Sequence, residues 1–424
     1  MSDRLNAAVE IGHGRTENRG SPLAWTWFSH PRALLDPAAA RVLVGAVTGG
    51  DGDVVVGWYD LESKAVGSAT LHAALERDDH NGAALYRRPD GRYLAMYAKH
   101  NSDPYTRWRL SDRPGDPSSW GPERRLDNGA GTTYNNVLRT DDRLYSFTRA
   151  TNWDPNLLVS EDDGESFTAA GRVITYAGSD DRPYPRYTGR DGVVHLITTE
   201  GHPHRVENGV YHGAVRDGQI TTTDGHTLAK AIHEPTTDPT DVTDLTPVFE
   251  PNTVVGDERL TRAWTVDVAI DPRGHPVAVI QARVEDDRRD HRFLYAHWHR
   301  SEWTIEPLAR AGGYLYPSEW DYTGLAALDP ADPSRVVVST PIDPRDPRPT
   351  ATYGLYAGLR DDDGHWEWSA LTPEDGADDL RPILVGGRAR TALVWMRGRY
   401  RSYTDWETRA MCLPDPFNDR NPGS

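Results

Sequence analysis

The sequence predicts an all-β fold, and two observations support this prediction. Apolar and β-branched runs are short and are separated by turns of Gly, Pro and Asp, in a chain of 424 residues with 38 Gly and 31 Pro. The turns also recur. Asp90-Gly91, Asp141-Asp142 and Asp191-Gly192 each precede a strand-like run, with 51 positions from Gly91 to Asp142 and 50 from Asp142 to Gly192. A sheet unit of this length, repeated along a chain, is typical of a β-propeller.

The number of units follows from the chain length. Division by about fifty residues gives roughly eight units, and allowance for terminal segments and long loops favours seven blades. No shift in composition marks a second domain, so we expect a single β-propeller domain spanning residues 1–424. Only residues 31–43 and 71–75 are rich in helix formers, and both stretches are short. The Pro- and Asp-rich segments 234–257 and 343–350 are expected to be loops on the propeller faces.

Residues 160–167 form a local turn motif that agrees with this architecture. Ser160, Asp162, Gly164 and Phe167 fit the pattern Ser-x-Asp-x-Gly-x-x-aromatic, known as an Asp-box. In such a hairpin turn the Ser and Asp side chains bond backbone groups, Gly adopts a positive φ and the aromatic ring packs beneath. The motif indicates architecture and carries no chemistry.

The composition restricts the partners. Net charge is −17, from 47 basic and 64 acidic residues, which argues against nucleic acid or an anionic membrane as a partner. An anionic substrate remains possible where Arg or Lys gather locally. Trp (14) and Tyr (19) outnumber Phe (6), a bias that suits carbohydrate surfaces as well as sheet packing. The single cysteine, Cys412, excludes an internal disulfide and a multi-cysteine zinc site.

The N-terminus gives an expectation about location. Residues 1–5 have no apolar signal-peptide core, and the chain has no apolar run of about 18 residues. We therefore expect a cytoplasmic protein, or a secreted one if the sequence has been trimmed.

One predicted hairpin brings two histidines together. Residues 83–86 and 92–97 read as paired strands, and the Asp90-Gly91 turn between them is a strong hairpin signal. His80 precedes the first strand and His100 follows the second. Because a hairpin returns on itself, both imidazoles are expected at one edge of the sheet. Two adjacent imidazoles are suited to acid–base chemistry near neutral pH.

Several segments, in order, resemble the BNR-type seven-bladed propellers, a group that includes ulvan lyases, rhamnose–glucuronate lyases and related α-L-rhamnosidases. The resemblance extends from about residue 20 to about residue 340 and is carried by residues 78–81, 134–136, 152–155, 182–187, 199–203, 208–212, 291–298 and 315–319. It implies a carbohydrate-active enzyme that acts at a rhamnose–uronate linkage.

The resemblance also implies a catalytic set of two His, a Tyr, an Arg and often a second Tyr. In this sequence these correspond to His80, His100, Tyr134 and Arg149, with the second Tyr near Tyr187, for which Tyr184 and Tyr211 compete. Some ulvan lyases carry a structural zinc with Cys ligands. Since this chain has only Cys412, outside the matching region, that site should be missing or rebuilt, and no cofactor is expected.

The chemistry implied is β-elimination from a uronate. A base removes the C5 proton, an acid protonates the leaving O4, and a cation holds the carboxylate. Arg149 is suited to hold the carboxylate, and His100 or His80 to act as the base. Tyr134 is suited to act as the acid or as a partner in proton transfer. Further substrate contacts are expected from Tyr187, Arg205, Asn81 and Asn101.

Two alternatives remain open at the level of sequence. A glycoside hydrolase on the same scaffold would need two carboxylates across the site, and Asp78, Asp79 and Glu319 offer no clear pairing. A non-catalytic, glycan-binding propeller is the second alternative, because fold alone does not decide function. His297 and His299 share one strand face, but two His without a third ligand do not predict a metal site.

Overall fold

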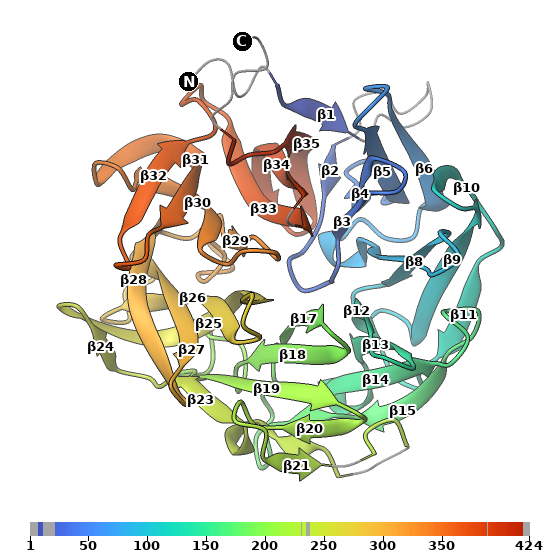
Figure 1. Cartoon of the computed structure of the whole chain (residues 1–424), viewed down its shortest axis with the longest axis horizontal. Coiled ribbons are helices and arrows are strands. Elements are labelled where there is room, and N and C mark those ends of the chain that lie inside the picture. The colour runs from blue at the N-terminus through green and yellow to red at the C-terminus, as the bar shows by residue number, and fades with distance from the viewer. Residues whose placement is uncertain (1–6, 12–21, 230, 235–237, 388, 419–424) are drawn as a thin grey trace.

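The computed structural model describes residues 7–11, 22–229, 231–234, 238–387 and 389–418. Within these residues seven sheets of four to six strands stand as blades around a central axis (Figure 1). Helical structure in this part of the chain is confined to three short 3-10 turns, η1 (Asp79–Asn81), η2 (Thr151–Trp153) and η3 (Val242–Asp244). The predicted seven-bladed β-propeller is confirmed. No helix of the described residues is long and apolar enough to cross a membrane.

The blades follow one another in chain order, and neighbouring strands within a blade are mostly consecutive. The first blade contains β2 (Leu23–Ala24), β3 (Ala33–Asp36), β4 (Arg41–Thr48), β5 (Val54–Asp60) and β6 (Val66–His72). The second contains β7 (Ala84–Arg87), β8 (Tyr93–Ala98), β9 (Tyr105–Arg113), β10 (Asp116–Trp120) and β11 (Arg124–Asp127). The third contains β12 (Thr133–Arg139), β13 (Leu144–Arg149), β14 (Pro155–Ser160) and β15 (Thr168–Arg172).

The fourth blade is the largest and is accompanied by a two-stranded sheet of β16 (Ile174–Thr175) and β22 (Thr240–Asp241). It contains β17 (Arg186–Arg190), β18 (Val193–Thr198), β19 (Val210–Arg216), β20 (Gln219–Thr221), β21 (Thr227–Ala229) and β23 (Thr246–Phe249). The fifth contains β24 (Thr253–Val255), β25 (Glu258–Ile270), β26 (Pro276–Val284), β27 (His291–His299) and β28 (Glu302–Gly312). The sixth contains β29 (Ala326–Leu328), β30 (Arg335–Asp343), β31 (Arg348–Arg360) and β32 (Trp366–Ala370).

The ring closes by pairing the two ends of the chain. The last blade contains β33 (Asp378–Gly387), β34 (Arg390–Ser402) and β35 (Asp405–Pro414), and β1 (Val9–Ile11) adds to it as the outermost strand. Val9 lies opposite Cys412 in an antiparallel register, so the blue and red ends of the chain meet in Figure 1. This pairing holds the N-terminal strand and the C-terminal strand in one sheet and so closes the ring.

The antiparallel order of each blade determines which loops share a face. The connection from the outer strand of one blade to the inner strand of the next ends on the same side as the loop between its second and third strands. The β6–β7 and β8–β9 connections therefore open on one face of the propeller, together with the equivalent loops of the other blades. All candidate site residues described below belong to this loop face or to strand ends beside it.

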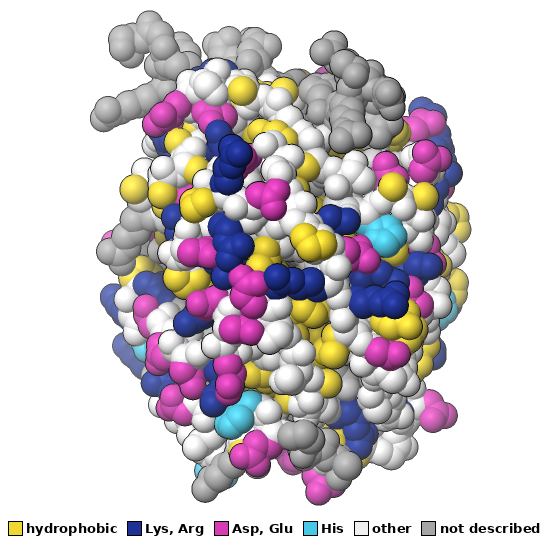
Figure 2. Space-filling view, turned by 90° about the vertical axis from the view of Figure 1, so that its right-hand side faces the viewer, with side chains coloured by type: hydrophobic (Ala, Val, Ile, Leu, Met, Phe, Trp, Pro, Cys, Tyr) yellow, Lys and Arg dark blue, Asp and Glu magenta, His cyan; other side chains and the backbone are white. Residues whose placement is uncertain are grey.

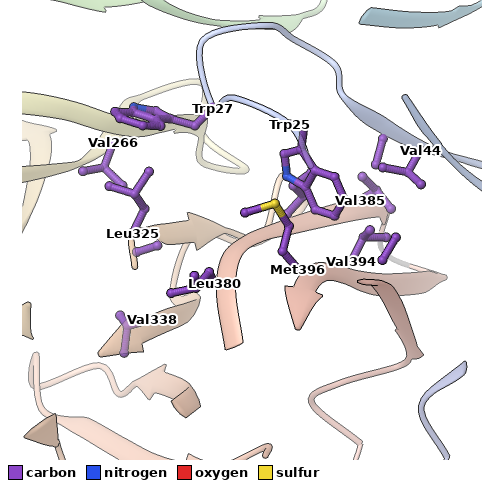
Figure 3. Close-up of a cluster of buried hydrophobic side chains, with 14 of the residues drawn as sticks. Trp25, Trp27, Val44, Val266, Leu325, Val338, Leu380, Val385, Val394 and Met396 are labelled. Carbon is purple, nitrogen blue, oxygen red and sulfur yellow. The ribbon is translucent and has the colours of Figure 1, made fainter. Parts of the chain in front are cut away.

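Residues 25–32 lie toward the centre of the ring and contact several blades. Trp25 and Trp27 are buried there, and Figure 3 shows them above side chains from several blades, among them Met396, Leu325 and Val266. Trp27 donates from Nε1 to the carbonyl of Thr265 at 3.3 Å, which ties the segment to the fifth blade. Burial of large aromatic rings from one segment against several blades stabilises the ring as a unit.

The structure corrects one loop predicted from the sequence and shortens another. The segment 234–257 was expected to be a loop, but its described residues include β22, β23 and β24. The reason is that Val248 and Phe249 are buried, so their backbone groups need partners, which β19 supplies. Residues 31–43 contribute β3 and the start of β4. Of the segment 343–350, only residues 344–347 form the predicted loop, because Asp343 ends β30 and residues 348–350 begin β31.

The Asp-box has the contacts expected of it. Ser160 Oγ accepts from the amide of Gly164 at 2.8 Å, and Asp162 accepts from the amide of Ser166 at 2.8 Å. Gly164 has a φ of 90°, which a residue with a side chain would adopt only under strain, and Phe167 is buried beneath the turn. On the side of the ring that Figure 2 shows, acidic and basic side chains of the described residues are interspersed.

Candidate active site

The β7–β8 hairpin brings the two candidate histidines together. Its strands pair from Ala84 opposite Met96 to Arg87 opposite Tyr93, as the sequence predicts. His80 lies in η1 just before β7, and His100 follows β8. Their rings are stacked, with centroids 3.8 Å apart and an interplanar angle of 13°. The prediction that the two imidazoles meet at one sheet edge is confirmed.

One carboxylate, Asp78, holds both imidazoles. Asp78 Oδ1 lies 2.6 Å from His80 Nδ1, and Asp78 Oδ2 lies 2.8 Å from His100 Nδ1. Asp78 Oδ1 also accepts from the backbone N–H of His80 at 2.9 Å, which caps η1. Since an ionised carboxylate only accepts hydrogen bonds, both Nδ1 atoms donate and the two Nε2 atoms are left for other chemistry.

These three residues also match the composition of a metal-ligand group. Two ligands that share a tetrahedral zinc at 2.0–2.2 Å lie about 3.3 Å apart. The separations of 2.6 and 2.8 Å between the carboxylate oxygens and the Nδ1 atoms are shorter than that. The arrangement is therefore that of charge-assisted hydrogen bonds.

The charges around His80 favour its protonated form. Burial lowers the pKa of His80, but the charge of Asp78 and hydrogen bonds to Asp78 and Asp79 outweigh it and raise that pKa to about 10. The same imidazoles hold the pKa of Asp78 below its usual value although burial opposes this. At neutral pH the site therefore contains an imidazolium at His80 and a carboxylate at Asp78.

This ion pair predicts a loss of stability at alkaline pH. The pKa of His80 is raised from 6.5 to about 10 by folding, so its contribution is complete below pH 6.5 and disappears as pH rises through about 10. We expect the free energy of unfolding of the wild-type protein to fall across this window more steeply than that of His80→Gln. Urea unfolding at several pH values measures this, and parallel curves for the two proteins would contradict it.

A buried network lies beneath η1. Asp79, which is fully buried, accepts from Arg381 Nη1 at 2.5 Å and from the Tyr400 hydroxyl at 2.5 Å through its Oδ2. Its other oxygen lies 3.1 Å from His80 Nδ1. Arg381 is thereby matched by a carboxylate, and η1 is fixed to the last blade.

Tyr403 is a neighbour of the imidazole pair that the sequence did not reveal. Its ring stands nearly perpendicular to both imidazoles, with centroids 5.3 Å from His80 and 5.6 Å from His100. It lies in the β34–β35 turn, more than 300 positions away in the sequence. Only the closed ring brings that turn beside η1, where the amide of Asp79 donates to the Tyr403 carbonyl at 2.9 Å.

Tyr134 lies on the other side of His80, with ring centroids 5.6 Å apart. Its φ is 63°, an unusual value for a bulky aromatic residue, and the β12–β13 register shifts between Thr133 and Asn136. Burial and the nearby Tyr184 raise the pKa of Tyr134 well above its usual value, so its hydroxyl keeps its proton at neutral pH. Backbone strain of this kind is concentrated at functional sites, and here it orients one phenol.

Arg149 ends β13 beside Tyr134. Its guanidinium donates to three backbone carbonyls, those of Trp153 (2.7 Å), Arg182 (3.2 Å) and Pro183 (3.3 Å), and lies 4.0 Å from the centroid of the Tyr184 ring. The side chain is buried, yet no carboxylate of the described residues forms an ion pair with it. The charge of Asp154 acts on this guanidinium only from beyond ion-pair distance, so the buried cation is suited to bind a carboxylate from outside the chain.

The structure places the other predicted site residues as follows. Tyr187 is buried, stacks on Phe147 at 4.4 Å and lines a narrow cavity of about 20 Å³ together with Tyr134, Arg149 and Tyr184. Asn81 is buried and donates to the Glu76 carbonyl at 3.1 Å.

Arg205 and Asn101 complete the predicted set. Arg205 is 61% exposed and pairs with Asp181 at 2.6 Å, whereas Asn101 has a φ of 62° in the loop after His100. The substrate contacts of Tyr187, Asn81, Arg205 and Asn101 remain predictions.

Comparison with known proteins agrees with the fold. Residues 45–311, more than half of the chain, match the model of a family described as BNR repeat-containing family member. No curated protein matches the sequence.

Solved structures with similar folds include a PL25 ulvan lyase bound to GlcA(1-4)Rha3S, which is 15% identical, with 92% of each chain covered and a TM-score of 0.62. The polysaccharide lyase Uly1 is 11% identical, with 91% of this chain and 90% of that chain covered and a TM-score of 0.54. Identities this low establish a shared fold alone.

Proposed function

The chain belongs to the BNR repeat-containing family, and from the arrangement of its site we propose that it is a lyase that cleaves a rhamnose–glucuronate linkage by β-elimination. The substrate is an oligosaccharide or polysaccharide that contains uronic acid. The ligand named for the ulvan lyase of similar fold, GlcA(1-4)Rha3S, contains such a linkage and supports this choice of substrate class.

The observation that carries the proposal is the unpaired charge of Arg149 beside a protonated tyrosine and an imidazole pair. Elimination at a uronate needs a cation at the carboxylate, since negative charge develops there when the C5 proton leaves. Arg149 has no ion-pair partner among the described residues. Tyr134 lies beside Arg149, and His80 lies beside Tyr134. The three functions that the reaction needs are therefore adjacent.

The two imidazoles have different roles in this scheme. Rings stacked at 3.8 Å repel when both are charged, and His80 has two carboxylates where His100 has one. We assign the imidazolium to His80 and the neutral ring to His100. Asp78 holds the proton of His100 on Nδ1, so the unprotonated Nε2 of His100 acts as the base.

The steps balance without a cofactor. His100 Nε2 removes the C5 proton, and the electrons of that C–H bond form the C4–C5 double bond while the C4–O4 bond breaks. Tyr134 donates its hydroxyl proton to O4, which leaves as the hydroxyl of the released sugar. Arg149 and the His80 imidazolium stabilise the charge on the carboxylate during proton removal. Solvent then restores the protonation states of His100 and Tyr134.

The hydrolase alternative is less well supported. An inverting or retaining hydrolase needs one free carboxylic acid and one free carboxylate at the sugar. Asp78 is occupied by two imidazoles, Asp79 by Arg381 and Tyr400, and Glu319 lies 3.4 Å from His202. A purely glycan-binding propeller would not need a strained tyrosine beside an acid–base pair.

Replacing Tyr134 by Phe removes the proposed acid and tests this function. We expect the wild-type protein to generate the ultraviolet absorbance of an unsaturated uronate from ulvan or from rhamnose–glucuronate oligosaccharides. Tyr134→Phe should lower kcat about 10²–10⁴-fold, the usual contribution of general acid–base catalysis. Tyr93→Phe is the matched control, because it removes a buried hydroxyl bonded to Asp36 at 2.8 Å, at the opposite end of the same hairpin. Released sugar without ultraviolet absorbance would contradict the lyase proposal.

A further inference from the structure

Trp153 is exposed at the edge of the candidate site. Four large hydrophobic side chains of the described residues are exposed, and Trp153, at 51%, is the only tryptophan among them. It ends η2, in the β13–β14 connection, which opens on the loop face of the propeller. Single exposed hydrophobic residues are common on protein surfaces, so exposure alone indicates nothing. Trp153 differs from an ordinary exposed hydrophobic residue in its backbone conformation and in the contacts that hold it.

The backbone that presents Trp153 is strained. Asn152 and Trp153 both have a φ of 59°, in the left-handed region. Asn adopts this conformation readily, but for a bulky residue such as Trp it is a true outlier. Two successive residues of this kind persist only where surrounding contacts enforce them, and such strain is found at ligand clamps and active sites.

A buried ion network enforces this conformation. Asp154 is fully buried and lies 3.2 Å from Arg172 Nη1 and 3.4 Å from Arg182 Nε. Arg182 Nε also donates to the Asn152 carbonyl at 2.8 Å, and Asn152 Nδ2 donates to Asp154 at 2.9 Å. Two arginines and one carboxylate therefore hold a loop of which the outermost side chains, Asn152 and Trp153, are exposed.

The same loop is connected to the proposed carboxylate site. The Trp153 carbonyl accepts from Arg149 Nε at 2.7 Å, so the backbone of Trp153 orients the guanidinium, while the side chain of Trp153 is exposed to solvent. A uronate bound to Arg149 would therefore have the indole within reach of its neighbouring sugar.

We propose that Trp153 forms a stacking subsite for the pyranose ring next to the uronate that Arg149 binds. The apolar face of a sugar ring packs on an aromatic face, and this contact excludes water from both. A stacking contact at the neighbouring ring would favour oligosaccharides over single uronates. The inference rests on the proposed function, since it places the uronate at Arg149.

Titration calorimetry tests the subsite in the Tyr134→Phe background, in which substrate is consumed slowly. The probes are a rhamnose–glucuronate tetrasaccharide and free glucuronate. Trp153→Ala should weaken binding of the tetrasaccharide about 10-fold, as expected for one aromatic contact, and should leave binding of glucuronate within about twofold. Trp153→Phe, which keeps a ring, should recover most of the affinity. Val254→Ala is the control, because Val254 is 64% exposed in β24, away from the site.

The outcomes separate the subsite from the function. If Trp153→Ala and Val254→Ala bind the tetrasaccharide equally well, the subsite is overturned while the proposed function stands. If Trp153→Ala weakens glucuronate as much as the tetrasaccharide, the loop acts only by orienting Arg149, and stacking is overturned. If the protein with native Trp153 binds neither probe, the proposed function itself fails and the subsite fails with it.

Discussion

Asp78→Asn should lower kcat by about 10³–10⁴-fold, the size of effect seen when a catalytic histidine is held in the wrong tautomer. An amide can accept from only one imidazole, because its nitrogen donates. The other imidazole must then present an unprotonated Nδ1 and carry its proton on Nε2, where it can no longer act as a base. The substitution also removes the charge that raises the pKa of His80 to about 10. Steady-state kinetics on a uronate oligosaccharide measures the loss.

The pH–rate profile distinguishes positioning from simple loss of structure. In Asp78→Asn the residual activity should decline at a lower alkaline pH than in the wild-type protein, since the pKa of His80 falls without Asp78. Asp379→Asn is the control. Asp379 is equally buried and bonds Trp395 and Arg397 away from the imidazoles, so this variant should lose stability but keep the wild-type profile. Near-normal kcat in Asp78→Asn would contradict the assigned role of the shared carboxylate.

Arg149→Lys should lower kcat/KM by about 10²–10³-fold, because a lysine cannot reproduce a planar fork that holds both a carboxylate and the surrounding carbonyls. The charge is retained, so the loss measures geometry. Both KM and kcat should worsen, since the contact exists in the bound substrate and strengthens as charge develops.

Arg190→Lys is the matched control for Arg149. Arg190 also donates to two backbone carbonyls, those of Ile270 and Asp271, but it lies at the β17–β18 turn on the opposite face of the propeller. Its substitution should leave kcat/KM unchanged within about twofold. Equal losses in the two variants would show that carbonyl contacts, and not carboxylate binding, explain the effect at Arg149.

Much of the fold could be predicted because it depends on residues that are close together in the sequence. The Asp-Gly turns, the recurring spacing and the Asp-box each depend on a few adjacent residues, and the β7–β8 hairpin lies where the sequence places it. The segment 234–257 could not be predicted in the same way. Its Pro and Asp content indicates loop, whereas β23 forms because Val248 and Phe249 pack against a distant strand.

In the candidate site, too, the contacts between residues close in sequence could be predicted, and the contacts between distant residues could not. His80 and His100 are joined by one hairpin, so their meeting follows from local sequence. Tyr403 comes from the last blade, and only ring closure brings it to the imidazoles. The role of Asp78 depends on side-chain geometry, because two adjacent carboxylates in the sequence have different partners in space. That no described carboxylate forms an ion pair with Arg149 likewise depends on the folded surroundings of its side chain and could not be predicted from the sequence.

The mass of the products tests the proposed lyase most directly. Elimination splits the substrate without water, so the two products together have the mass of the substrate, and one of them carries the C4–C5 double bond. Hydrolysis adds one water to that total. Mass spectrometry of a rhamnose–glucuronate tetrasaccharide after incubation with the protein should show products whose masses sum to that of the substrate. Products that together are one water heavier would contradict β-elimination and assign the site to a hydrolase.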